Sequence, residues 1–164
     1  MKTKIFSGIS IVVLVVLDQI LKIYIQNSFR TGTHKFIHFG NTEILNITYC
    51  ENTGAAFSIF EGKQAFLIIM TSLLMVVCIW FLFKNKEILI TICLTLIIAG
   101  GFGNLIDRIF RGYVIDFFEI RLFHFGIFNF ADCLVVIGAA VFAFYVFIYE
   151  SKAKALKNET DGEL

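Results

Sequence analysis

Two carboxylates in the second half of this 164-residue chain, Asp116 and Asp132, could work together as an acid and a base. The stretch between them is short enough to fold back, so the two groups could meet. Two carboxylates at close range cannot both ionise cheaply, so one of them keeps a proton. One group can then act as a general base for water while the other polarises a carbonyl. An aspartyl hydrolase is therefore one hypothesis for this pair.

Other ionisable residues have structural as well as functional interpretations. Asp18 and Lys22 are spaced i,i+4, so on a helix they share a face and could form a local ion pair. The adjacent Asp107 and Arg108 could form another ion pair at the end of a helix. Ionisable side chains inside apolar segments are costly, and their clustering is by default a sign of a functional site.

Two further motifs have simple structural explanations. Asp132 would be favoured near a helix N-terminus, where Asn129 is an equally good capping residue. The run Gly100-Gly101-Phe102-Gly103 lacks the third Gly and the preceding strand of a phosphate-binding loop. Small residues at these positions more simply allow helices to approach closely.

The sequence gives no sign of a metal or cofactor site. Its four Cys residues include no CxxC pair, and Cys78 and Cys93 lie inside apolar runs, where they are typical of small hydrophobic residues. The three His residues show no metal-ligand spacing. We therefore expect no metal, nucleotide or organic cofactor.

The composition indicates a membrane protein. Hydrophobic residues make up 58% of the chain and charged residues only 16%, where about 25% charged is usual for soluble domains. The mean hydropathy is +0.82. A soluble domain of this size could not bury so much apolar surface, so lipid must cover the rest. The net charge of +1 offers no electrostatic argument for nucleic acid binding, so we expect no such partner.

Four segments are long and apolar enough to cross a bilayer, which requires about 20 residues. We expect an all-α multi-pass protein with membrane spans at about 5–26, 64–83, 88–108 and 131–149. The first segment resembles a signal peptide, but no small-x-small cleavage site follows it. We expect residues 1–150 to form a single membrane-embedded domain, and the polar residues 151–164 to form a disordered cytoplasmic tail.

Basic residues in short loops predict the orientation of the spans. Lys and Arg total seven on each side, so their number decides nothing, but the short link 84–87 contains two Lys residues. This density predicts that the link and both termini are cytoplasmic. The residues at about 27–63 and 107–129 then lie outside, where all the carboxylates near membrane depth gather. Leu45, Ile47 and Tyr49 alternate with polar residues, which predicts a strand in a small extracytoplasmic β-sheet.

Five motifs, in this order, resemble those of the bacterial lipoprotein signal peptidases (signal peptidase II). The order, the spacing and the layout of four spans agree from about residue 5 to 150. The motifs are Asp18-Gln19-Ile20-Leu21-Lys22, Asn52-Thr53-Gly54-Ala55-Ala56-Phe57-Ser58, Gly100-Gly101-Phe102-Gly103-Asn104-Leu105-Ile106-Asp107-Arg108, Gly112-Tyr113-Val114-Ile115-Asp116-Phe117 and Phe128-Asn129-Phe130-Ala131-Asp132.

The resemblance implies a membrane aspartyl endopeptidase in the bacterial cytoplasmic membrane that needs no cofactor. We expect it to act as a monomer. Its substrate would be a prolipoprotein whose lipobox Cys already carries diacylglycerol, and it would cut the bond before that Cys. By motif, Asp116 and Asp132 would be the catalytic pair. The residues implied in substrate binding or site support are Asp18, Lys22, Asn52, Gly54, Asn104, Asp107, Arg108 and Asn129.

Two positions depart from the family pattern. Gly126 stands where the family often has Pro, and Cys133 stands where Ser often follows the final Asp. Neither change removes a catalytic group, although both bear on loop rigidity and on hydrogen bonding around the site.

A small proton- or cation-coupled transporter or channel subunit is the alternative function. Such a protein could use the same carboxylates as an ion path. The spans show no inverted repeat, however, and the carboxylates gather at one end instead of continuing through the membrane. These two features favour the peptidase.

Overall fold

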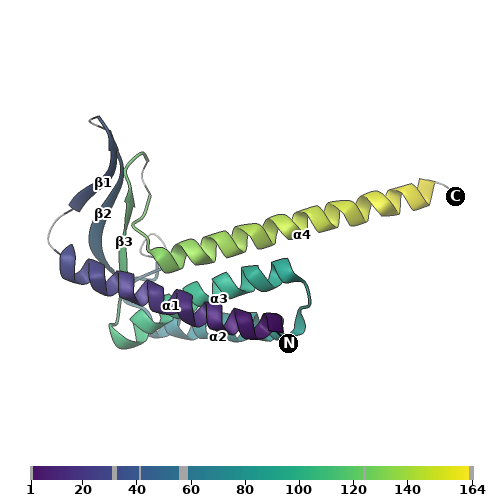
Figure 1. The fold of residues 1–164 in the computed structure, drawn as a ribbon, viewed down its shortest axis with the longest axis horizontal. Helices are drawn as coiled ribbons and strands as arrows, with labels where there is room; N and C mark the ends of the chain where they lie inside the picture. Colours follow the sequence, from purple (N-terminus) through teal and green to yellow (C-terminus); the bar gives the residue numbers. More distant parts are fainter. Residues whose placement is uncertain (1, 31–32, 41, 56–58, 124, 163–164) are drawn as a thin grey trace.

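The computed structural model describes residues 2–30, 33–40, 42–55, 59–123 and 125–162 of the chain. Four long helices and three strands make up the fold (Figure 1). In chain order, the elements are α1 (Lys2–Ser28), β1 (Thr33–Phe39), β2 (Thr42–Asn52), α2 (Gln64–Lys84), α3 (Ile88–Phe110), β3 (Val114–Ile120) and α4 (Phe130–Gly162).

All four helices are long and apolar enough to cross a membrane. This result confirms the expected fold class of four spans with a small sheet. The helix α4 continues to Gly162, so residues 151–162, which we expected to be a disordered tail, are helical instead. The segment contains three Lys and two Ala residues, which have high helix propensity, and it continues a helix that is already nucleated.

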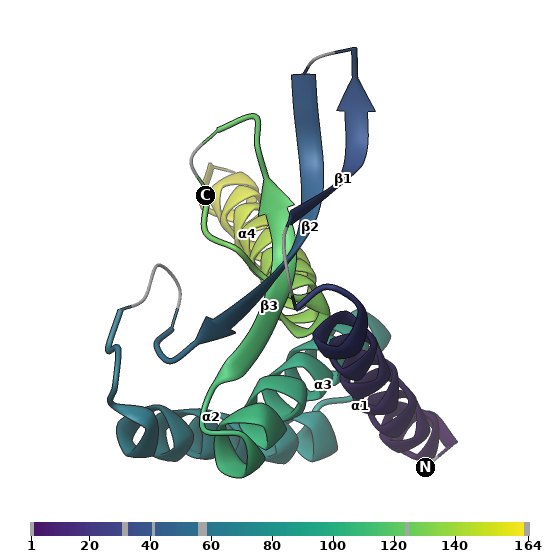
Figure 2. The same ribbon diagram turned by 90° about the vertical axis from the view of Figure 1, so that its left-hand side faces the viewer.

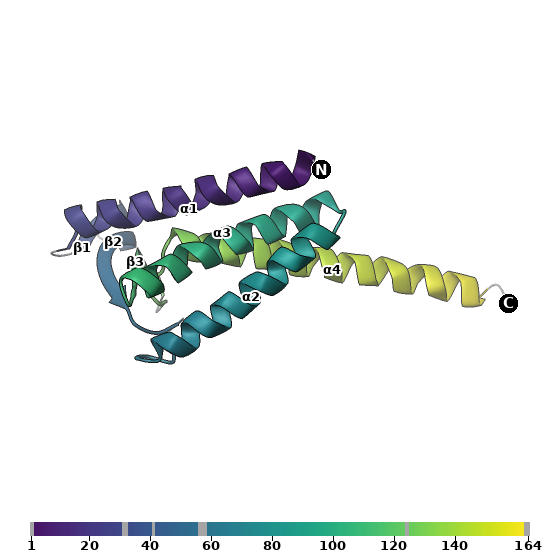
Figure 3. The same ribbon diagram turned by 90° about the horizontal axis from the view of Figure 1, so that it is seen from below.

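The helix α3 lies at the centre of the bundle and packs against the other three helices (Figure 3). In the most apolar 18-residue stretch of α3, 61% of the residues are buried. In the corresponding stretches of α1, α2 and α4, only 17%, 22% and 17% of the residues are buried. The apolar residues exposed on these outer helices, such as Val12, Val76 and Phe144, therefore form the surface that faces lipid. Both α2 and α4 pack on α3 but make little contact with each other.

Small residues allow this close packing, as the sequence predicted. A Cβ at Gly100 would collide with the backbone oxygen of Ala131 in α4. A Cβ at Gly138 of α4 would lie 2.8 Å from the backbone oxygen of Cys93 in α3. Cys93 and Cys78 are buried, which confirms their interpretation as small hydrophobic residues.

The three strands form one antiparallel sheet in the order β1-β2-β3. The strand β2 contains the predicted alternating residues Leu45, Ile47 and Tyr49. It runs from the tip of the hairpin to the loop that leads into α2 (Figure 2). Its pairing with β3 is irregular between Ile47 and Cys50, after which Cys50 lies opposite Asp116. The sheet therefore carries Asp116 to the end of the helical bundle.

The sheet and the chain termini lie at opposite ends of the bundle (Figure 1). At the end away from the sheet, the Lys4 ammonium donates hydrogen bonds to the backbone oxygens of Leu82 and, at 2.8 Å, Asn85. A cation at this position satisfies carbonyls at the C-terminal end of α2. The contact ties the start of α1 to the turn between α2 and α3.

Candidate active site

Asp116 is a buried carboxyl group on β3, with an exposed fraction of 2%. Its Oδ2 accepts a hydrogen bond of 2.8 Å from the amide of Asn52, and its Oδ1 accepts one of 2.6 Å from the amide of Asn129. Burial, and secondly the charge of nearby Asp132, raise the pKa of Asp116 to about 7, against the opposing effect of the two amide donors. Asp116 therefore exchanges a proton near neutral pH.

Asp132 lies in the first turn of α4 and helps to start that helix. Its Oδ2 accepts the Asn129 backbone N–H at 3.0 Å, while Asn129 Oδ1 accepts the Asp132 backbone N–H at 2.9 Å. This reciprocal pair is a capping box in which Asn129 is the cap. The other oxygen of Asp132 accepts a hydrogen bond of 2.7 Å from the amide of Asn104. Asp132 is thus held by donors from both its own helix and α3.

Two amide side chains connect the carboxylates. The Nδ2 of Asn129, which also donates to Asp116, lies 3.1 Å from the Oδ1 of Asn104. Because Asn104 in turn donates to Asp132, a chain of hydrogen bonds runs from one carboxylate to the other. The structure therefore brings Asp116, Asp132, Asn104 and Asn129 together, as the sequence predicted.

A second cluster, centred on Lys22, lies behind this pair. The Lys22 ammonium is 2.9 Å from Asp18 and 2.8 Å from Asp107, and all three side chains are fully buried. It also donates to Asn104 Oδ1 at 3.0 Å. The i,i+4 ion pair between Asp18 and Lys22 is confirmed, but Asp107 pairs with Lys22 and Arg111 and not with its neighbour in sequence.

Gln19 and Arg111 complete the cluster and were missed in the sequence. The Gln19 amide donates to Asp107 at 3.1 Å, and Arg111 donates to Gln19 Oε1 at 2.9 Å. Arg111 is four residues after Asp107, so the rule that linked Asp18 with Lys22 would have found it. Gln19 lies in the first of the motifs that resemble the family, but its spacing alone does not mark it as a partner of Asp107.

Arg108 connects α3 with the turn that follows β2. Its Nη2 donates to the backbone oxygen of Gly54 at 3.0 Å, and the Gly54 N–H donates to Asn52 Oδ1 at 2.9 Å. These bonds place the Asn52 amide against Asp116. The Arg108 Nε is buried and has no hydrogen-bond partner among the described residues. Ala56, Phe57 and Ser58 of the same motif lie outside the described residues.

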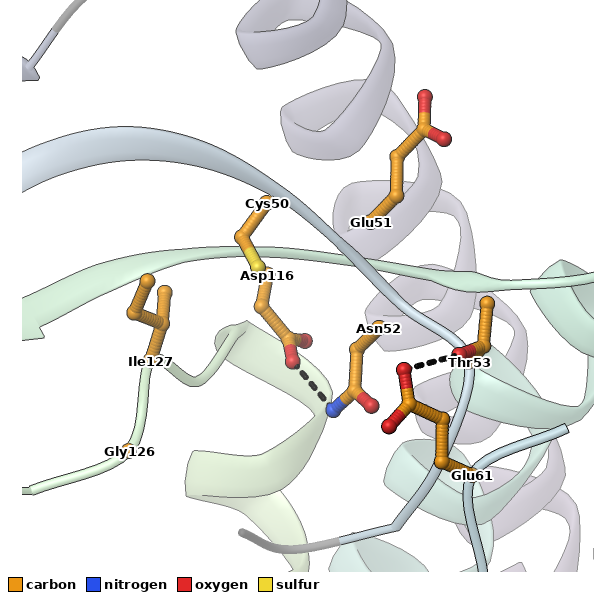
Figure 4. Close-up of a pocket in the computed structure, with 8 residues that line it drawn as sticks. All are labelled: Cys50, Glu51, Asn52, Thr53, Glu61, Asp116, Gly126 and Ile127. Carbon is orange, nitrogen blue, oxygen red and sulfur yellow. Dashed lines mark hydrogen bonds between the residues drawn. The ribbon is translucent and has the colours of Figure 1, made fainter. Parts of the chain in front are cut away.

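Two cavities meet at Asp116. A groove of about 640 Å³ runs along α2, α3 and α4 and is lined mainly by apolar side chains, with Arg108, Asp116 and Asp132 among its polar residues. A smaller, more polar pocket of about 180 Å³ also has Asp116 in its lining (Figure 4). The residues that line both cavities are Asn52, Asp116, Gly126 and Ile127. An apolar ligand and a polar one could therefore reach the same carboxylate.

Potential metal ligands do not gather at this site. Within the described part of the chain, no group of three or more His, Cys, Asp or Glu side chains is arranged to hold a metal ion. The carboxylates of the site are bound instead by amides, backbone N–H groups and one ammonium.

Comparisons with known proteins agree on one family. The family model described as Signal peptidase (SPase) II matches residues 10–148. The lipoprotein signal peptidase of Lactococcus lactis subsp. lactis (strain IL1403) is 43% identical over 136 residues, covering 82% of this chain and 89% of that protein. The lipoprotein signal peptidase of Enterococcus faecalis (strain ATCC 700802 / V583) is 39% identical over 151 residues, covering 90% and 91%.

A solved structure shows the same fold. It is described as a bacterial membrane enzyme determined by the in meso method at 2.3 Å resolution, and it matches with a TM-score of 0.81 at 29% identity over 90% of each chain. Helices, sheet and sequence thus define a multi-pass bacterial membrane protease. The chain belongs to the signal peptidase II family. It is an aspartic protease that removes signal peptides from prolipoproteins, and this result does not support the transporter alternative.

Proposed function

We propose that Asp116 and Asp132 are the catalytic pair and that they cut the peptide bond just before a diacylglyceryl-modified Cys. The observation that carries this proposal is the position of Asp116. It is a buried carboxyl with a pKa of about 7, it is connected to Asp132 through amides, and it lies where an apolar groove meets a polar pocket. The cleavage site of a lipidated precursor likewise joins an apolar part to a more polar part.

The proposed reaction uses the two carboxyl groups in turn. Asp132, whose two oxygens accept hydrogen bonds, takes a proton from water as the water oxygen attacks the scissile carbonyl carbon. Asp116 donates its proton to the carbonyl oxygen, which gives a tetrahedral diol. The diol collapses, the C–N bond breaks, and the leaving nitrogen takes the proton from Asp132. Asp116 recovers its own proton, so the pair is ready for another cycle.

The surrounding polar residues hold this pair and meet the substrate. Asn52, Asn104 and Asn129 fix the carboxylate oxygens by the hydrogen bonds described above. Arg108 lines the groove with a buried Nε that is free of partners in the described residues, so it can donate to a carbonyl of the bound peptide. Asp18, Lys22 and Asp107 act as positioning residues, because they hold Asn104 and the first turn of α4.

The groove is the proposed site for the signal peptide and the acyl chains. Leu74 and Met75 of α2 and Val135 and Val136 of α4 line its walls. Because α2 and α4 barely touch, the groove lies between two helices that face lipid. A substrate that remains in the bilayer can enter there without exposing its acyl chains to water. The residues proposed for the site all come from one chain, and we propose that the protein acts as a monomer.

We also propose that both termini are cytoplasmic and that the catalytic pair lies at the extracytoplasmic side. The N-terminus and the link between α2 and α3 lie at the same end of the bundle, opposite the sheet (Figure 3). That end carries Lys2, Lys4, Lys84 and Lys86, as the positive-inside rule requires for a cytoplasmic side. A reporter fused after Asn85 should be cytoplasmic, and one fused near Gly40 should be outside.

A gel-shift assay with purified protein tests the proposed substrate. One prolipoprotein is supplied in two forms, with and without diacylglycerol on its lipobox Cys. We expect a shift to the mature size only for the lipidated form. Sequencing of the product should place the lipidated Cys at its N-terminus. Equal cleavage of both forms, or a cut elsewhere, would contradict the proposal.

A further inference from the structure

The polar pocket beside Asp116 is distinct in chemistry from the groove that would hold the signal peptide. Its remaining lining residues are Cys50, Glu51, Thr53 and Glu61. It adjoins the groove through the shared residues Asn52, Asp116, Gly126 and Ile127, so a peptide that crosses Asp116 can extend from one cavity into the other. If the apolar part of a precursor occupies the groove, the chain on the other side of the cut bond continues into this pocket.

The two glutamates of the pocket are not equivalent. Glu51 accepts a hydrogen bond of 2.7 Å from the Tyr49 hydroxyl, and its carboxylate points away from Asp116 (Figure 4). The Glu61 carboxylate is directed towards the Asn52 side of the pocket, and its contact with Thr53 Oγ1 is long, at 3.5 Å (Figure 4). Glu61 is therefore the carboxylate placed to meet a bound chain.

No basic side chain neutralises Glu61 in the part of the chain that the structure describes. The ion pairs found there join Lys22, Arg111 and Arg121 to other carboxylates. Glu61 is also exposed, so a chain that enters the pocket can reach its carboxylate. An unpaired charge at the rim of a peptide site attracts opposite charge and repels like charge, which gives specificity more than affinity.

We propose that this pocket is the subsite for the first residues of the mature lipoprotein, those that follow the lipidated Cys, and that Glu61 there selects basic over acidic side chains. The inference rests on the proposed function, because it assumes that the bond is cut at Asp116. It adds a specificity-determining residue that takes no part in the chemical step.

Three lipidated precursors test this inference. They differ only at the second to fourth residues after the Cys, which are all Lys, all Ser or all Glu. We expect kcat/KM of the native protein to be about fivefold higher for the Lys substrate than for the Glu substrate at low salt, as befits an exposed charge pair. The ratio should fall as salt is added, because salt screens exposed charges.

Variants assign the preference to one carboxylate. Glu61→Gln should bring the ratio close to one, and Glu61→Lys should reverse it. Glu51→Gln, which removes the carboxylate that points away, should leave the ratio of the native protein. Thermal unfolding in detergent checks that each variant is folded. If Glu61→Lys does not fold, Glu61→Gln alone is enough to test the assignment.

The outcomes separate this inference from the proposed function. If the native protein does not cut the lipidated Ser substrate, the proposed function fails. If it cuts all three substrates with equal kcat/KM, or if Glu61→Gln leaves the ratio unchanged, only the assignment of Glu61 is overturned. If Glu51→Gln changed the ratio as much as Glu61→Gln does, the preference would come from the general negative charge of the region. That result would also overturn the assignment of Glu61.

Discussion

Two pairs of carboxylates lie side by side in this protein and are held in different ways. Asp18 and Asp107 share the ammonium of Lys22 and are fully buried. Asp116 and Asp132 are bound by neutral amides and backbone N–H groups. A shared ammonium ties the first pair into one ion-pair cluster across two helices, whereas the side chains and backbone groups that donate to the second pair carry no charge. The comparison suggests that the first pair holds the structure and that the second performs the chemistry.

Replacing Asp116 or Asp132 by Asn should have the largest effect on activity. Asn keeps the size of the side chain but cannot cycle a proton, so we expect cleavage to fall by at least about 10²–10⁴-fold. The double variant should be little worse than either single one, because the two groups act as a unit. The gel-shift assay with lipidated precursor measures the loss. Near-normal turnover by either variant would refute the assignment.

Replacing Lys22 by Met should have the largest effect on stability. It leaves Asp18 and Asp107 buried without their shared cation, and breaking a buried ion pair in this way typically costs about 3–5 kcal/mol. Thermal unfolding in detergent should show a large decrease in Tm, whereas Asp116→Asn should remain folded. If Lys22→Met were as stable as the native protein, the contrast between the two carboxylate pairs would be lost.

The stability of the native protein should depend on pH through Asp116. Its pKa in the folded protein, about 7, is higher than the ordinary value of 3.8, mainly because of burial. The stability that this group contributes is therefore fully present below about pH 4 and is lost as the pH rises through 7. The loss is of the order of a few kcal/mol, at 1.36 kcal/mol for each unit of pKa.

Asp116→Asn removes this titration. Its advantage in Tm over the native protein should grow from pH 4 to pH 8. Activity of the native protein should decrease above about pH 7, because Asp116 then lacks the proton for the scissile carbonyl. A Tm difference that does not change with pH would contradict the raised pKa of Asp116.

Gly103→Ala should have a smaller effect that links the two pairs. A Cβ at Gly103 would lie 2.6 Å from Asp18 Oδ2, so the carboxylate would have to move. Overpacking of this kind typically costs about 1–3 kcal/mol. Gly8→Ala is a matched control within a helix, since nothing lies within 4 Å of its Cβ position. We expect a lower Tm and reduced cleavage for the first variant only, and equal behaviour of the two would argue against close packing around Asp18.

Local spacing and composition determined much of this protein in advance. Membrane spans require long apolar segments, so the four apolar segments of the sequence predict four helices. Residues three or four apart on a helix are neighbours, so the sequence also offered the ion pair of Asp18 with Lys22. It left Asn129 and Asp132 as equal candidates for the helix cap, and the structure places Asn129 there. The ordered motifs identified the family, and the resemblance predicts that Asp116 and Asp132 are its catalytic pair in this chain.

Contacts between elements were decided only by the tertiary structure. The pairing of Asp107 with Lys22 joins α3 to α1, and the bond from Asn52 to Asp116 depends on how β2 and β3 are aligned past an irregular pairing. The groove exists because α2 and α4 pack on α3 and not on each other, whereas the polar pocket is lined by β2, β3 and the loops that follow them. Spacing along the chain specifies neighbours within one helix, whereas helix packing and strand alignment bring distant residues together.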